Sequence, residues 1–90
     1  MGKWARLVSQ GAFPPEVVSR LPRLVWYGRE RLLVEQHQGI VTYQENSLRF
    51  QTVCGLLNIQ GVGLELIQYG PEQAMVKGRI HQVSYPEGEA

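Results

Sequence analysis

The chain has 90 residues, of which nine are Lys or Arg and eight are Glu, with no Asp, and its formal net charge is +1. This length favours a single domain, and the near balance of charge excludes a strongly basic nucleic-acid arm and an acidic tail. The longest run without charge, residues 50–64, is interrupted by Gln, Asn and three glycines, so it does not fit a membrane-spanning helix of about 20 apolar residues.

The first element expected along the chain is a short basic amphipathic helix. Trp4, Leu7 and Val8 stand at positions i, i+3 and i+4, with Arg6 and a lysine beside them. The first 24 residues hold four basic side chains and one Glu, a net charge of +3, whereas the rest of the chain has five basic and seven acidic side chains. Two roles fit this segment: Trp4, Arg6, Leu7 and Val8 lie on an anionic membrane surface, or Trp4 and Leu7 cover the open end of the core.

Two features favour a cytoplasmic location. The basic start resembles that of a signal peptide, but Ser, Gln and Gly at positions 9–11 interrupt the apolar stretch that would have to follow. Cys54 is the single cysteine and can form no internal disulfide, which is usual for cytoplasmic proteins. We therefore expect the protein to stay in the cytoplasm.

Prolines mark the end of the N-terminal segment. Pro14 and Pro15 separate it from residues 16–21, where an acidic start and a proline directly after the end predict one or two helical turns. The domain organisation that follows is an N-terminal basic helical segment, a β-domain and a tail, at residues 1–22, 23–86 and 87–90.

From Arg23 onward the sequence is typical of β-strands. Short runs rich in Val, Ile, Leu, Tyr and Phe are separated by glycines, and no apolar set is sustained at a spacing of 3.6. The predicted fold class is therefore all-β. We expect one small domain, an antiparallel meander of about six to seven short strands that forms a curved sheet or a small sandwich.

If successive strands form hairpins, their turns predict which residues face each other. The expected turns lie at residues 36–39, 44–47, 54–55 and 62–63. They place four pairs opposite each other: Val34 and Val41, Val41 and Phe50, Phe50 and Ile59, and Ile59 and Leu66. All four turns keep one face apolar, which predicts the core: Leu32, Val34, Val41, Tyr43, Leu48, Phe50, Leu57, Ile59, Leu64 and Leu66. Further on, Val83 and Tyr85 break the alternation of the last strand, which predicts a bulge near His81 and Gln82.

The other face of the predicted sheet is not fully polar. It carries four apolar side chains near one end, with Val53 opposite Leu56 and Leu56 opposite Tyr69: Val53, Leu56, Ile67 and Tyr69. An apolar group on a sheet face indicates that something covers it. The N-terminal segment folding back is one candidate, and a partner protein or a second copy of the chain, in contact with these four residues, is the other.

No set of residues with recognised catalytic or ligand-binding spacing emerges. Gly61 and Gly63 resemble the start of a dinucleotide-binding turn, but Leu66 stands where the third glycine belongs and a strand follows. Glu35 and His37 alternate at a strand end, and two ligands without a third make a poor metal site. We therefore predict no bound cofactor and no metal.

Cys54 is the only conceivable nucleophile, with His37 or His81 as its base. The meander places His37 and Cys54 in turns two strand spacings apart, about 10 Å, which is beyond hydrogen-bond reach. We interpret Cys54 as a residue of a hairpin turn, and we predict no catalytic residues.

A different class of function is a small β-barrel that binds single-stranded nucleic acid or a ligand. Such a barrel presents exposed aromatic side chains on a basic sheet face. Tyr43 and Phe50 are instead expected in the core, and the strand region is net negative. Nucleic acid is therefore not the expected partner, and the barrel stays the alternative.

Five motifs follow one another along most of the chain: Leu21-Pro22-Arg23; Glu35-Gln36-His37-Gln38-Gly39-Ile40; Leu48-Arg49-Phe50 with Thr52; Gly55-x-Leu57-x-Ile59-x-Gly61; and Val76-x-Gly78-x-Ile80-x-x-Val83-x-Tyr85. In this order and spacing the sequence resembles the YabP/YqfC family of sporulation proteins, and it is more similar to the YqfC branch, which shares the Pro-Arg entry and a His-x-Gly-Ile segment. One departure is Gln36, where the family segment has Asn, so no role of that side chain is carried over.

The resemblance implies a role in spore formation in the mother cell of an endospore-forming bacterium. It also implies an integral membrane partner and a peripheral position at the outer membrane of the developing spore. It brings no known enzymatic activity and no mapped functional residues. We therefore expect a non-enzymatic β-sheet interaction module, which can also form a homo-oligomer.

Overall fold

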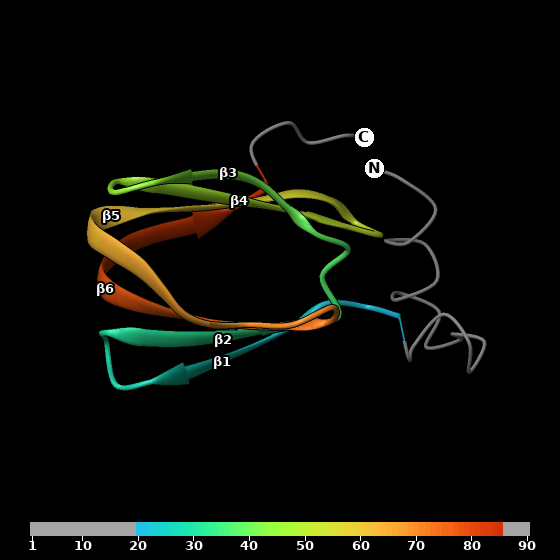
Figure 1. Cartoon of the computed structure of the whole chain (residues 1–90), viewed down its shortest axis with the longest axis horizontal. Helices are drawn as coiled ribbons and strands as arrows, with labels where there is room; N and C mark the ends of the chain where they lie inside the picture. Colours follow the sequence, from blue (N-terminus) through green and yellow to red (C-terminus); the bar gives the residue numbers. More distant parts are fainter. Residues whose placement is uncertain (1–19, 86–90) are drawn as a thin grey trace.

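The computed structural model describes residues 20–85, which form six β-strands and no helix (Figure 1). The predicted N-terminal helix and the membrane-surface residues Trp4, Arg6, Leu7 and Val8 lie outside the described residues, as does the C-terminal tail. The strands are β1 (Arg23–Tyr27), β2 (Arg31–Glu35), β3 (Ile40–Gln44), β4 (Ser47–Thr52), β5 (Gly55–Tyr69) and β6 (Gln73–Ser84).

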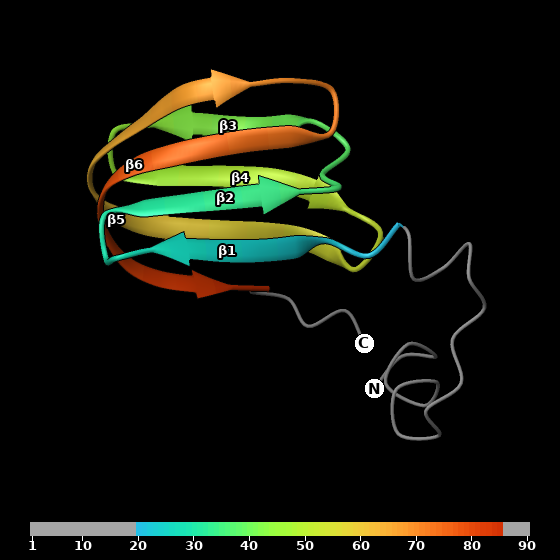
Figure 2. The same cartoon turned by 90° about the horizontal axis from the view of Figure 1, so that it is seen from below.

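All six strands belong to one antiparallel sheet in the order β1-β2-β6-β5-β4-β3. β5 and β6 are long, and both bend near their middle, so that the sheet folds over onto itself in two layers (Figures 1 and 2). The upper layer in Figure 1 holds β3, β4, the first half of β5 and the end of β6, and the lower layer holds β1, β2, the start of β6 and the end of β5. The all-β antiparallel prediction is confirmed.

Three glycines at the bend allow the two long strands to approach closely. A Cβ atom on Gly78 would lie 2.7 Å from the carbonyl oxygen of Gly63, and a Cβ atom on Gly61 would collide with the carbonyl oxygen of Arg79. Gly63 and Gly78 also have φ angles of 65° and 140°, which L side chains rarely adopt. The predicted turn at residues 62–63 is therefore wrong, because these glycines bend one continuous strand and do not separate two.

The predicted hairpin at residues 36–39 is also wrong. β2 pairs with β6, and β3 lies at the opposite edge of the sheet, so Val34 does not face Val41. The connecting loop crosses from the lower to the upper layer: the Gln36 N–H donates to the Glu72 carbonyl at 2.6 Å, and the Gln38 N–H donates to the Gln51 carbonyl at 2.7 Å. Long-range pairing thus overrides a segment whose local sequence is typical of a turn.

The β3–β4 hairpin forms at the predicted turn, with Tyr43 facing Leu48, and the β4–β5 hairpin forms with a shifted register. In β3, Ile40 and not Val41 faces Phe50, because the register shifts at Val41, whose side chain is 57% exposed. The β4–β5 turn is displaced by one residue, and Phe50 faces Leu57 and not Ile59. Moving the turn by one residue changes each cross-strand partner on β5 by two residues. The same side chains therefore still point inward.

Thr52 explains the position of the second turn. Its hydroxyl donates to the Gly55 carbonyl at 2.7 Å and accepts from the Cys54 N–H at 3.0 Å. These bonds fix a tip at Val53 and Cys54, one residue before the predicted tip, and Gly55 follows with a φ of 114°. Cys54 is therefore a turn residue, as predicted.

The core fills the space between the layers. Its buried side chains are Leu32, Val34, Leu48, Phe50, Leu57, Ile59, Leu64, Ala74 and Val76, with Leu66 packed against them. Two predicted core residues, Val41 and Tyr43, are exposed instead, because β3 is an edge strand and contains a bulge. The predicted bulge near His81 is confirmed: Gln60 pairs with Gln82 and Gly61 with Ile80, which leaves His81 without a cross-strand partner.

Candidate functional site

His37 lies between the two layers, at the end of the sandwich opposite the bend. Only 3% of its surface is exposed, and its ring centroid lies 5.1 Å from that of Phe50 in the upper layer and 5.2 Å from that of Tyr69 in the lower layer. Its Nδ1 atom accepts the Gly39 N–H at 2.9 Å, and its Nε2 atom is buried and has no hydrogen-bond partner among residues 20–85. The ring therefore packs as part of the core and joins the layers.

His37 forms no hydrogen bond with the Cys54 thiol. Its Nδ1 atom accepts the Gly39 N–H, and its Nε2 atom has no partner within the described part of the chain. Burial raises the pKa of that thiol, which disfavours the nucleophilic thiolate. Among residues 20–85, no three His, Cys, Asp or Glu side chains gather closely enough to hold a metal ion.

A Cys54→Ser variant tests the electrostatics of this hairpin. Burial raises the pKa of both the Cys54 thiol and the Tyr85 phenol above their ordinary values of 9.0 and 10.0. The protonated Cys54 and Tyr85 side chains therefore make their full contribution to stability below about pH 9. This contribution is lost as the pH rises through the folded-state pKa values. We expect the free energy of unfolding to decline above pH 9, and Cys54→Ser to weaken that decline while it leaves stability at pH 7 within about 0.5 kcal/mol. Chemical denaturation between pH 7 and 10 measures both, and an equal decline in the two proteins would contradict the expectation.

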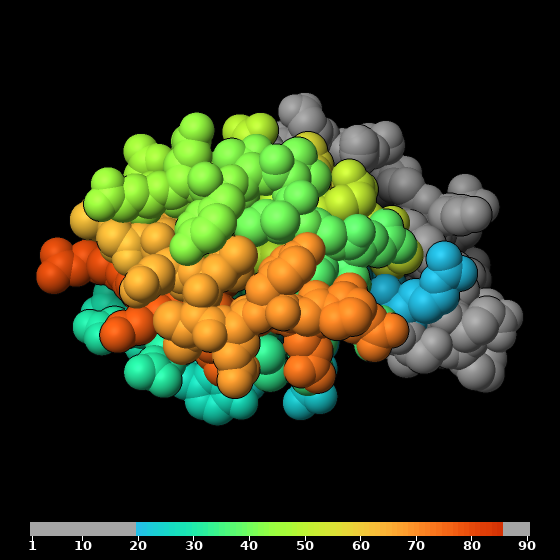
Figure 3. All heavy atoms as spheres, in the orientation of Figure 1, coloured from blue at the N-terminus to red at the C-terminus, as the bar shows by residue number. Residues whose placement is uncertain are grey.

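Two tyrosines close one side of the sandwich. The Tyr43 hydroxyl of β3 accepts the Leu66 N–H of β5 at 3.0 Å, and the Tyr69 hydroxyl of β5 accepts the Ile40 N–H of β3 at 3.2 Å. The Leu64 N–H also donates to the Glu45 carbonyl at 2.8 Å. Figure 3 shows the side chains of β3 (green) against those of β5 (orange) across this side. We call this set of contacts between β3 and β5 the tyrosine seam; it occupies polar backbone groups that an open sheet edge would expose.

The structure does not bring the four predicted partner-contact residues onto one face. Val53 and Leu56 are half-buried at the β4–β5 hairpin, and Leu56 faces Gln51 and not Tyr69. Tyr69 lies in the lower layer and stacks on His37, because β5 bends between Leu56 and Tyr69. Ile67 is 41% exposed, in the lower layer, at a register shift beside Leu66. The assignment of all four to a partner contact stays a prediction.

The outer face of the lower layer carries an apolar row that the sequence reasoning missed. Val25 faces Leu33 on β2, and Leu33 faces Met75 on β6. Their neighbours Leu32, Val34, Ala74 and Val76 point into the core, so Leu33 and Met75, and Val25 opposite them, point outward. On β5, Ile67 lies at the register shift next to Gln68, the residue that pairs with Met75, and with it we define the lower-face stripe: Val25, Leu33, Met75 and Ile67. Figure 2 looks onto this face, and no strand of the described chain lies over it.

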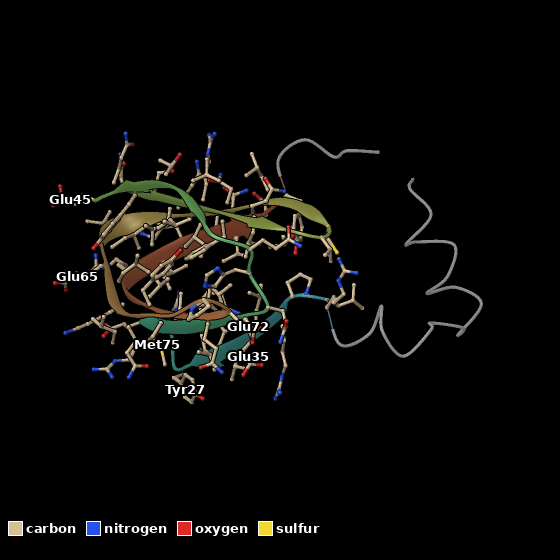
Figure 4. All side chains as sticks on the ribbon, turned by 45° about the vertical axis from the view of Figure 1, so that its right-hand side comes forward. Tyr27, Glu35, Glu45, Glu65, Glu72 and Met75 are labelled. Atoms are coloured by element: carbon tan, nitrogen blue, oxygen red, sulfur yellow. The ribbon has the colours of Figure 1, made fainter. Side chains whose placement is uncertain are left out.

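Charged and polar residues flank the lower-face stripe on both sides. One flanking row is Arg23, Glu35 and Gln73, in which the Arg23 Nη1 atom lies 3.5 Å from the Glu35 Oε1 atom. The other is Tyr27, Arg31, Lys77 and Glu65. Figure 4 shows Tyr27 projecting from the lower layer away from the upper one. An apolar centre with a polar rim is the usual composition of a protein-binding surface.

Among residues 20–85, buried apolar side chains from both layers form a contiguous core between them. A hollow at the bend is lined by Arg29, Glu30, Arg79, Ile80 and His81, which mix both charges and include no Phe, Tyr or Trp ring for base stacking. No helix long and apolar enough to cross a membrane is found in the described part of the chain.

The comparisons with known proteins cover the whole β-domain. The model of the YabP family matches residues 20–90. The "Uncharacterized protein YqfC" of Bacillus subtilis (strain 168) is 32% identical over 74 residues, which cover 82% of this chain and 80% of that protein. No solved structure gives a significant match. The resemblance in the sequence motifs is thus confirmed, and the chain belongs to the YabP family.

Proposed function

We propose that this protein is a non-enzymatic interaction module of spore formation, which binds a protein partner through the lower-face stripe. The observation that carries the proposal is the stripe itself. One face of an antiparallel sheet is ordinarily polar when water covers it. Here the outward residues on three adjacent strands, Val25, Leu33 and Met75, are all apolar.

The partner we propose is an integral membrane protein at the outer membrane of the developing spore, with this chain on the cytoplasmic side in the mother cell. The proposed role in spore formation is supported by the family to which the chain belongs. The membrane partner is proposed from what the resemblance to that family implies. The predicted amphipathic residues Trp4, Arg6, Leu7 and Val8 would add a peripheral contact with anionic lipid, which is weak alone and sufficient only beside a second attachment.

Ile67→Glu tests the surface, and Val62→Glu is its matched control. Both variants place a new carboxylate on β5 at an exposed position, since Ile67 is 41% and Val62 is 58% exposed. Val62 lies at the bend, opposite Arg79 and away from the stripe. A carboxylate placed in an apolar contact lowers the binding free energy wherever the partner covers it, and a tenfold loss of affinity corresponds to about 1.4 kcal/mol.

We expect Ile67→Glu to keep the melting temperature close to that of the wild type and to lower co-purification with a membrane protein from sporulating cells more than tenfold, with a matching loss of spores. Val62→Glu is expected to behave as the wild type in both assays. A folded Ile67→Glu protein that retains its partner and supports normal sporulation would show that the stripe is not the contact surface.

A further inference from the structure

The sheet has two edge strands, β3 and β1, and they differ in what covers them. The β3 edge is held by the tyrosine seam, in which Tyr69 of β5 accepts the Ile40 N–H. On the other side of the molecule, β1 pairs with β2 alone among the described strands. The outer edge of β1 is thus a sheet edge that residues 20–85 leave without a neighbouring strand, as is the end of β6, which beyond residue 77 pairs with β5 alone.

β1 also lacks the features that usually prevent an edge from pairing. It contains no proline, its register with β2 is continuous from Arg23 to Tyr27 without a bulge, and its charged residue, Arg23, stands at its end. Natural edge strands without a central charge, proline or bulge are ready to accept another strand.

Trp26 indicates that a neighbour is missing on that side. It faces Leu32, a fully buried core residue, so its ring points toward the inner face of the sheet. Even so, 46% of its surface is exposed, and Leu24 on the same face is only half-buried. A large inward-facing aromatic residue gains burial if another strand with an apolar side chain lies next to β1.

We propose that β1 pairs with β1 of a second copy of this chain, antiparallel and with the two-fold axis at Val25. In that register Leu24 of each copy faces Trp26 of the other, and the two Val25 side chains face each other. Arg23 of each copy then lies beside the Tyr27 ring of the other, in the arrangement of a cation–π pair. The five-residue strand is therefore complementary to itself at every position, as an isologous interface requires.

The same register continues the lower-face stripe from one copy into the other. Val25 ends the stripe at the β1 edge, and pairing with Val25 of the second copy joins the two stripes into one apolar band across both sheets. This self-association goes beyond the proposed function, because it concerns contact between two copies of the chain, which is measured on purified protein without any partner.

A cysteine at position 25 tests the register directly. In the Cys54→Ser background, Val25→Cys places two thiols directly opposite each other, with Cα atoms about 5 Å apart, a separation that a disulfide spans. Oxidised glutathione converts the two thiols to an intermolecular disulfide and is itself reduced to two molecules of glutathione. We expect a covalent dimer from Val25→Cys, and none above background from the control Val41→Cys on the other edge strand, where the residue is more exposed than the half-buried Val25.

Charged variants test the same contact without a covalent bond. In the full-length chain, Val25→Glu and Val25→Lys should each raise the dimer dissociation constant at least tenfold, because like charges then face each other. A mixture of the two variants should restore dimers containing one copy of each, as seen by native mass spectrometry. Wild-type protein that stays monomeric up to about 100 μM would overturn the proposal. So would dimers that Val25→Glu leaves intact, or a mixture that restores nothing.

Discussion

Gly61→Ala is expected to destabilise the domain by about 3 kcal/mol or more, because the added methyl group meets main-chain atoms and not movable side chains. A Cβ atom at this position collides with the Arg79 carbonyl oxygen and lies 3.0 Å from the Ile80 Cα atom. Gly61 pairs with Ile80 at the bend, so relief of the collision requires separation of β5 from β6. These two strands join the upper and lower layers, and their separation loosens both.

The matched control is Gly70→Ala, because a Cβ atom there would lie 3.7 Å from its nearest neighbour, an ordinary contact. Thermal unfolding of the two variants and the wild type measures the difference. For a domain of this size we expect Gly61→Ala to lower the melting temperature by more than about 12 °C, with Gly70→Ala close to the wild type. Equal melting temperatures for both variants would mean that β5 does not bend at Gly61 as described.

His37→Ala is expected to cost about 2 to 4 kcal/mol of stability. The substitution removes the ring that lies between Phe50 of the upper layer and Tyr69 of the lower layer, and it leaves a cavity at that position. It also removes the acceptor of the Gly39 N–H, which helps to hold the loop that crosses between the layers.

His81→Ala provides the control, because His81 is exposed and has no cross-strand partner. We expect its free energy of unfolding to stay within about 0.5 kcal/mol of the wild type. His37→Phe separates the two contributions, since it keeps the aromatic ring and removes the acceptor, and its stability should fall between those of His37→Ala and the wild type. Urea denaturation of the three variants measures this order. A His37→Ala protein as stable as the wild type would show that the ring does not join the layers.

Much of the inner face could be predicted from the sequence because alternation survives errors in turn position. The β4–β5 turn was placed one residue too late, yet Phe50 and Leu57 remained inside, since the error moved the partner by two residues. At β3, by contrast, the bulge shifts the register by one residue. Val41 is therefore exposed although its spacing favours the core.

The bend and the crossover could not be predicted because both depend on contacts distant in the sequence. A Val-Gly pair at residues 62–63 suits a hairpin tip as well as a bend, and only the approach of Gly78 distinguishes them. The loop at residues 36–39 likewise combines positive φ angles at Gln36 and Gly39, which suit a tight turn, with main-chain bonds to two different layers. Local residue preferences do not distinguish a tight hairpin turn from a loop that crosses between the layers.

Only one residue of the lower-face stripe, Ile67, was among the predicted contact residues. Val25, Leu33 and Met75 were missed because their row exists only when β2 pairs with β6, and the sequence favoured pairing of β2 with the following strand. A signal was present nonetheless. In both Leu32-Leu33-Val34 and Ala74-Met75-Val76 the outward residue stands between two inward ones and is apolar as well, which is unusual for a face covered by water.

The most direct test of the interaction module is site-specific photo-crosslinking in sporulating cells. A benzophenone side chain at position 75 would lie in the middle of the stripe, and one at position 62 would lie at the bend. In strains that still form spores, we expect position 75 to yield one predominant covalent adduct with an integral membrane protein and position 62 to yield none. Adducts of equal yield at both positions, or no adduct at position 75 in a strain that sporulates normally, would contradict the proposal that this protein acts through its lower-face stripe.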